Sequence, residues 1–124
     1  MNDNLFDTTV LIDYLRLTPK TVDLFNKIRE PIITSITVCE LYQGARNKEI
    51  LNKIKKTLRE FKIIYLTEKD SKLAVDLIEN YHLTHGLIIP DALIAATAIE
   101  NDLVLITSNV KDFQMIKGLK VKKW

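Results

Sequence analysis

The sequence has few of the residues that mark secreted or membrane-bound proteins. Cys39 is its only cysteine, so no disulfide can form within the chain and no oxidising compartment is indicated. We expect Cys39 to be a small buried residue and not a nucleophile. No apolar run approaches the ~18 residues of a membrane span, and the first residues do not form a basic segment leading into an apolar one. We therefore expect a cytoplasmic protein with no signal peptide and no membrane contact.

Glycine and proline are also scarce, at three residues each among 124. No stretch resembles a linker, a repeat or a glycine-rich phosphate loop, and no Ser/His/Asp motif is present. His82 and His85 have no third partner at the spacing of a zinc site, so we interpret them as surface or helix-capping residues. With 47% hydrophobic and 27% charged residues, the chain has the composition of a single globular domain, which we assign to residues 1–124.

The formal net charge of +2 is too small to identify a nucleic-acid partner. Its distribution says more, because basic residues concentrate between Lys48 and Lys62 and are opposed there only by Glu49 and Glu60. Two interpretations stay open for this stretch. It is either the solvated face of a helix or a stripe that binds phosphate groups.

Short apolar runs alternate with amphipathic segments along the chain. The strand signals are residues 5–6, 32–34, 63–65 and 103–106, with a final strand near Val121. The helical signals are residues 8–16, 19–29, 38–45 and 47–61, a segment after the Thr67–Asp70 capping box, Asp91 to about Asn101, and a short turn near 109–114. This alternation predicts an α/β fold with a mostly parallel sheet covered by helices on both faces.

Four polar side chains stand where helices are expected to begin: Asp7, Glu40, Asp91 and Asn109. Asp7 and Asn109 each follow a predicted strand. In a parallel sheet, such junctions gather at the carboxyl edge, where ligands bind. Acids brought together there repel one another, and a divalent cation is the usual means of keeping several of them ionised at neutral pH. The pattern therefore indicates a metal site and, with basic residues nearby, favours nuclease chemistry.

Each of these positions also has a purely structural interpretation. Thr37-x-x-Glu40 fits a capping box, Asp91 suits a helix N-terminus, and Asn109-x-x-Asp112 fits a helix cap. Asp7 is harder to explain in this way, because an Asp between Leu-Phe and Val-Leu-Ile risks burying a charge. It is the joint arrangement of the four that favours a functional site.

Four segments carry a resemblance to a known family. They are LFDTTVLID (5–13), TSITVCEL (34–41), PDALIAATA (90–98) and TSNVKDF (107–113). In this order they resemble the motifs of PIN-domain ribonucleases, and the best match is to the VapC-like toxins of type II toxin–antitoxin modules. The resemblance implies a three-layer α/β/α sandwich, with Mg²⁺- or Mn²⁺-dependent cleavage of RNA, often at a structured tRNA or rRNA loop.

By position, Asp7, Glu40 and Asp91 match the three core acids of that family. Asn109 falls where many members carry a fourth acid and others have Asn, so one-metal and two-metal sites both stay open. Thr9 stands where Asn is common, which we regard as a minor change. Carboxylate oxygens are hard ligands suited to these cations. We assign Asp7, Asp91 and Glu40 to the metal, with Glu40 also orienting or deprotonating the attacking water and Asn109 holding a water or phosphate oxygen.

The resemblance also implies protein partners. We expect a cognate antitoxin, whose amphipathic helix would lie in a groove along Val38–Phe61, and pairing of two copies as a homodimer. The alternative function is a PIN-like module that binds RNA or a partner without catalysis. The presence of all three core acids argues against that alternative.

Overall fold

The computed structural model describes residues 3–124, which form a five-stranded sheet with helices on both faces. The strands are β1 (Asn4–Phe6), β2 (Ile32–Thr34), β3 (Lys62–Ile64), β4 (Val104–Thr107) and β5 (Lys120–Lys123). They lie in the order β3-β2-β1-β4-β5, and every neighbouring pair is parallel. The predicted parallel α/β sheet is therefore confirmed.

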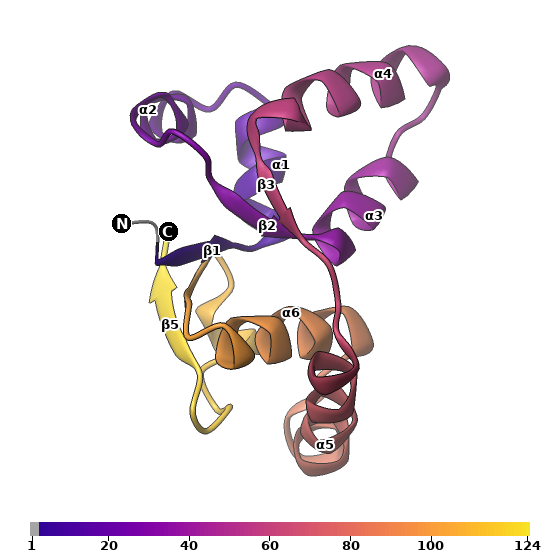
Figure 1. The fold of residues 1–124 in the computed structure, drawn as a ribbon, viewed down its shortest axis with the longest axis vertical. Coiled ribbons are helices and arrows are strands. Elements are labelled where there is room, and N and C mark those ends of the chain that lie inside the picture. The colour runs from indigo at the N-terminus through magenta and orange to yellow at the C-terminus, as the bar shows by residue number, and fades with distance from the viewer. Residues whose placement is uncertain (1–2) are drawn as a thin grey trace.

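Six α-helices and two short 3-10 turns connect these strands within the described residues. They are α1 (Thr8–Leu15), α2 (Pro19–Lys27), α3 (Ser35–Gln43), α4 (Lys48–Thr57), η1 (Leu58–Glu60), α5 (Glu68–His85), α6 (Ile89–Glu100) and η2 (Val110–Asp112). Figure 1 shows α5 and α6 together on one side of the sheet and α1 to α4 on the other. This is the three-layer α/β/α sandwich that the resemblance implied.

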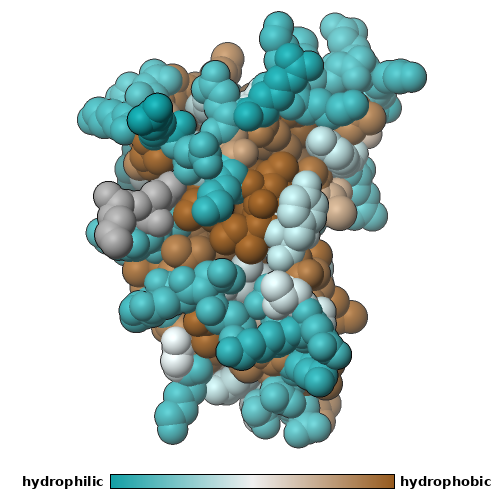
Figure 2. Space-filling model, in the orientation of Figure 1, coloured by the Kyte–Doolittle hydropathy of each residue, from teal (hydrophilic) through white to brown (hydrophobic). Residues whose placement is uncertain are grey.

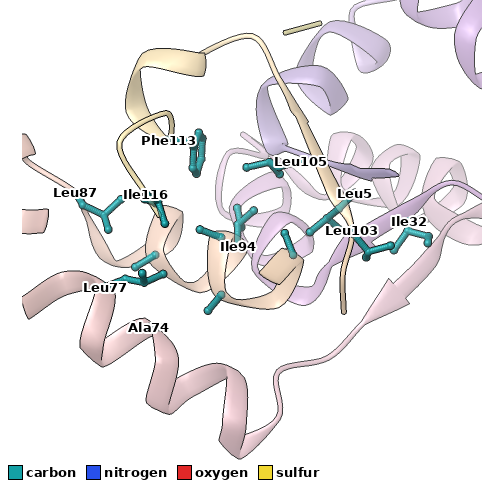
Figure 3. Packing of buried hydrophobic residues seen from close by; sticks show 14 residues of the cluster. Leu5, Ile32, Ala74, Leu77, Leu87, Ile94, Leu103, Leu105, Phe113 and Ile116 are labelled. Atoms are coloured by element: carbon teal, nitrogen blue, oxygen red, sulfur yellow. The ribbon is translucent and has the colours of Figure 1, made fainter. Parts of the chain in front are cut away.

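Two apolar clusters fill the spaces between the sheet and the helices, because successive strand side chains point to opposite faces. Leu5, Ile32 and Leu105 belong to the cluster that includes α5 and α6, which Figure 3 shows from close by. Phe6 and Ile106, each the next residue along its strand, join the cluster formed with α1, α2 and α4. The sheet is thus packed on both faces, which fixes the positions of the residues at its carboxyl edge.

The helix expected from Val38 begins three residues earlier, directly after β2. Thr34 ends the strand and also caps α3, since its hydroxyl oxygen accepts a 3.2 Å hydrogen bond from the Thr37 backbone N–H. The predicted capping box from Thr37 to Glu40 is therefore wrong, because both residues lie inside the helix. Glu40 needs another explanation.

One predicted cap is confirmed, the predicted side-chain cap by Asn109 is not formed, and some elements end at other residues than expected. Thr67 and Asp70 form the expected capping box at the start of α5. The helix predicted over 47–61 ends at Thr57 and continues as η1, with Asn47 as its N-cap. Cys39 is exposed instead of buried, because α3 turns Thr37 and Leu41 toward the core.

The two histidines are exposed, and His82 Nδ1 lies 2.8 Å from the Leu87 carbonyl oxygen just beyond the end of α5. This agrees with the predicted surface or capping role. None of the helices within residues 3–124 has both the length and the apolar content needed to cross a membrane.

Candidate functional site

The predicted positions Asp7 and Asn109 lie just beyond the carboxyl ends of the neighbouring strands β1 and β4. Phe6 pairs with Ile106 in the sheet, and the Asp7 backbone N–H donates a 2.9 Å hydrogen bond to the Ile106 carbonyl oxygen. Just beyond β4, the Asn109 backbone N–H donates to Thr107 Oγ1 at 3.0 Å. The turn after β4 is therefore held beside the carboxylate that follows β1.

Asp7 is a buried carboxylate oriented by two hydroxyl groups. Its residue is 3% exposed, and Oδ2 accepts hydrogen bonds from Thr107 Oγ1 at 2.7 Å and Thr9 Oγ1 at 3.1 Å. Thr9 Oγ1 also accepts from the Ser108 backbone N–H at 3.2 Å. Asp7 precedes α1 but makes no side-chain cap bond, so capping does not account for it. Thr9, which we regarded as a minor change, is part of the shell around this acid.

Glu40 reaches the same edge from the middle of α3. Its Oε1 accepts a 2.7 Å hydrogen bond from Thr8 Oγ1, the residue that directly follows Asp7. Thr8 Oγ1 also lies 2.9 Å from Thr37 Oγ1, and both threonines are buried. These contacts position the Glu40 carboxylate and link it to Asp7 through one residue.

Asp91 is the third residue of α6 and is half-buried. Burial raises the pKa of its carboxyl group from 3.8, and the negative charges of Asp7, Asp112 and Glu40 raise it further, to about 7. Asp7, Glu40 and Asp91 are therefore close enough to interact electrostatically. The structure brings the three predicted acids to one edge of the sheet, and their catalytic role stays a prediction.

Asp112 joins this group of acids, although its spacing from Asn109 suggested only a helix cap. It ends η2, affects the pKa of Asp91 more than Glu40 does, and lines with Asp91 a hollow of about 130 Å³. Asn109 itself is exposed and makes no side-chain cap bond to η2. The sequence signal for Asp112 was the acid three residues after Asn109, which a cap explained equally well.

The donor chemistry of this edge fits a hard divalent cation. All the acids offer carboxylate oxygens, and the pKa of Asp91 is raised first by burial and then by the negative charge of its neighbours, which a cation would offset. Among residues 3–124, no three His, Cys, Asp or Glu side chains lie close enough together to enclose an ion as they stand. An ion bound at this edge would therefore need the carboxylates to move closer together.

The chain belongs to the PIN-domain family, because the model of that family matches residues 5–119. Two proteins of Mycobacterium tuberculosis (strain ATCC 25618 / H37Rv) are similar over nearly the whole chain. Ribonuclease VapC10 is 35% identical over 120 residues, covering 94% of this chain and 90% of that protein. Ribonuclease VapC19 is 32% identical over 121 residues, covering 94% and 96%.

Solved structures match the same fold along most of the chain. VapBC2 from Rickettsia felis, bound to a DNA fragment from its promoter, has a TM-score of 0.80 with 27% identity and covers 98% of both chains. A toxin–antitoxin complex from Klebsiella pneumoniae has a TM-score of 0.77 with 32% identity and covers 94% of both chains. These similarities extend the match from sequence motifs to the arrangement of all three layers.

Proposed function

We propose that this protein is an Mg²⁺- or Mn²⁺-dependent endoribonuclease and the toxin of a type II toxin–antitoxin pair. The observation that carries the proposal is the gathering of Asp7, Glu40, Asp91 and Asp112 near one another, where burial and the charges of the other three acids raise the pKa of Asp91 to about 7. Such a cluster suits a divalent cation that acts on a phosphodiester. The names of the relatives VapC10 and VapC19, and the toxin–antitoxin complexes among the matching structures, support this assignment.

We assign a role to each residue of the site from the hydrogen bonds that its side chain makes. Asp7, Asp91 and Glu40 would hold the metal ion, which when bound acidifies water and offsets charge on the phosphate. Thr107 and Thr9 orient Asp7 through Oδ2, so that Oδ1 takes part in neither bond. Thr8 holds Glu40 by Oε1, so Oε2 can orient the attacking water or accept its proton. The Asn109 amide can donate a hydrogen bond to a water or phosphate oxygen.

A cleavage assay separates this function from the alternative, a PIN-like module that binds RNA or a partner without cutting. Labelled tRNA and rRNA fragments are incubated with the protein after EDTA treatment, with and without added Mg²⁺ or Mn²⁺. We expect cleavage only with metal, and none by Asp7→Asn or Asp91→Asn, each of which removes charge but little volume. Circular dichroism checks that both variants fold. RNA binding without cleavage in any metal would favour the non-catalytic module.

A groove between α1, α3 and α4 is our candidate for antitoxin binding, and its wall combines residues of the predicted stretch Val38–Phe61 with Ile12, Leu15 and Arg16. This groove has a volume of about 330 Å³, and Glu40 and Arg16 lie in its wall together with mostly apolar side chains. Ile50 in this wall is 39% exposed. Because Glu40 lines the groove, an antitoxin helix laid in it would reach the acidic edge, where a basic side chain could replace the cation.

An enzyme that acts on RNA under the control of an antitoxin would work in the cytoplasm as one domain over residues 1–124. Pairing as a homodimer has a candidate surface on α5 and α6, where Val75 and Ile89 are 67% and 66% exposed. Figure 2 shows that apolar side chains also interrupt the hydrophilic surface on the face it presents. Exposed apolar surface of this kind commonly marks a protein interface.

A further inference from the structure

A second hollow opens beside the acids, and its wall carries two lysines. It has a volume of about 250 Å³ and is lined by Ser108, Asn109, Val110, Lys111, Asp112 and Lys123. Asp112 lines both this hollow and the smaller one that contains Asp91. The lysine hollow therefore adjoins the acidic site, with Asp112 at the boundary.

The register of β5 explains why Lys123 reaches this place. Thr107 pairs with Lys123, so the lysine lies at the carboxyl edge, next to the strand whose Thr107 hydroxyl holds Asp7. Side chains two residues apart on a strand share a face. Val121 packs against the cluster of α5 and α6, and Lys123 is on this same face. Lys122 is on the opposite face with Trp124, which packs against the other cluster.

Lys111 and Lys123 have no acidic partner among the described residues. The ion pairs within residues 3–124 join Lys69 to Glu100, Lys72 to Glu68 and Lys120 to Asp102. Asp112 is the one acid in the wall of the hollow, and it forms an ion pair with neither lysine. Two unpaired ammonium groups lining one concave surface make it attractive to an anion.

We propose that this hollow binds a backbone phosphate of the RNA, next to the phosphodiester that is cut, through Lys111 and Lys123. The inference rests on the proposed function for the identity of the substrate, but the charge and shape of the hollow are independent of catalysis. A strand held here by one phosphate passes Asp112 to reach Asp91. The hollow would thereby set which phosphodiester lies over the acids. The basic stretch 48–62, the alternative considered from sequence, does not line this hollow.

Binding of RNA without cleavage tests the proposal. A short fluorescein-labelled single-stranded RNA is titrated in EDTA with the full chain carrying Asp7→Asn, and anisotropy is measured at several salt concentrations. Lys111→Ala and Lys123→Ala should each weaken binding several-fold. Each should also reduce the slope of log affinity against log salt by about 0.7, the value for one phosphate contact on a single strand. Lys123→Arg, which keeps the charge, should bind like the parent.

Lys122→Ala is the matched control, because it removes the same charge from the adjacent residue on the opposite face of β5. It should leave the salt slope nearly unchanged. Equal effects of Lys122→Ala and Lys123→Ala would mean that only overall charge matters and would overturn the proposal. The cleavage assay on the unmodified chain is read separately. If RNA binding depends on Lys111 and Lys123 but no RNA is cleaved, only the nuclease function is rejected. If RNA is cleaved but binding does not depend on these lysines, only phosphate binding in the hollow is rejected.

Discussion

Threonine hydroxyls hold the acids of this site in place. Thr107 and Thr9 donate to Asp7, and Thr8 donates to Glu40, so each of these carboxylates is oriented by a hydrogen bond from a side chain. Thr107 and Thr8 are buried. Because a carboxylate can rotate, such donors decide which oxygen points toward the ligand. The threonines are therefore part of the candidate site together with the acids.

Replacing Thr107 by valine tests this role, since the two side chains have nearly the same shape. The Asp7 carboxylate would lose its 2.7 Å hydrogen bond, so RNA cleavage should fall by about 10- to 100-fold. The free energy of unfolding should fall by about 1 kcal/mol. Thr21→Val is the control, because the buried Thr21 hydroxyl donates at 2.7 Å to the Thr18 carbonyl oxygen at the start of α2. It should lose similar stability without losing activity. Cleavage by Thr107→Val at the parent rate would contradict the assigned role.

The pKa of Asp91 leads to a prediction about stability in the absence of metal. A carboxyl group whose pKa is 3.8 in the unfolded chain and about 7 in the folded protein keeps its proton longer in the folded state. As pH rises from about 4 to about 7, the unfolded state therefore releases the proton first, and the stability of the metal-free protein falls across this window. Added Mn²⁺ should restore stability above pH 7, where the acids are ionised.

Thermal unfolding in EDTA across this pH range measures the effect, with Asp91→Asn as the comparison. Other groups titrate as well, so the difference between the two proteins is the informative quantity. Asp91→Asn should lose less stability between pH 4 and 7 than the parent. If the stability of the two proteins changed with pH in the same way, the raised pKa assigned to Asp91 would be wrong.

Among the individual residues, the sequence indicated the acids but not the threonines that donate hydrogen bonds to them. Asp7, Glu40 and Asp91 stood out because acids where helices are expected to begin are chemically conspicuous, although Glu40 lies inside α3. Thr8 and Thr107 did not, because threonine is ordinary in strands and at helix starts, and only the fold shows which hydroxyl meets which carboxylate. Asp112 was passed over because its spacing from Asn109 also fits a cap.

At the scale of the elements, strand positions followed closely from the apolar runs. β2 has the predicted bounds, and β3 and β4 are shifted by one residue. The start of α3 was missed because no loop separates it from β2, and Thr34 serves both elements. Thr37 and Glu40, which lie inside α3, have the spacing of a capping box and were therefore mistaken for the start of the helix. The order of the strands was not predicted, since it depends on packing between segments distant in sequence.

We expect the groove between α1, α3 and α4 to bind the antitoxin, which a substitution in its wall can test. Ile50→Glu would put a charge into a mostly apolar wall, so the affinity for the antitoxin should fall about tenfold or more, or about 1.4 kcal/mol. Asn52→Glu adds the same charge on an exposed part of α4 outside the groove wall and serves as control. Calorimetry with the product of an adjacent reading frame measures both affinities. Equal affinities would place the antitoxin elsewhere.

In the whole molecule, Asp7 and Asp91 lie at the carboxyl edge of the sheet, and two of the exposed apolar residues, Val75 and Ile89, lie on neighbouring helices. Val75 on α5 and Ile89 on α6 help to line one shared hollow on the outer surface of these two helices. In a symmetric dimer, the same patch of each copy contacts its equivalent, so an apolar face is self-complementary. This face is therefore the candidate for pairing two copies.

Light scattering on the purified chain should give about twice the mass of one chain. Val75→Glu should shift the protein toward a single chain, because two copies of the new charge would meet at the interface. Glu79→Lys is the control, because it changes an exposed charge on the same helix and Glu79 does not line the hollow between α5 and α6. A monomeric parent protein would remove the homodimer and leave the nuclease assignment standing.

We propose above all that Asp7, Glu40 and Asp91 together bind a divalent cation at the sheet edge. Mn²⁺ binding to the protein without RNA, measured by electron paramagnetic resonance of the free ion, tests it most directly. The parent chain should remove Mn²⁺ from solution, while Asp7→Asn and Asp91→Asn should bind it far more weakly, with Asp13→Asn on the same segment as an unaffected control. Mn²⁺ binding of equal strength in the parent and in both variants would contradict the assignment of these acids.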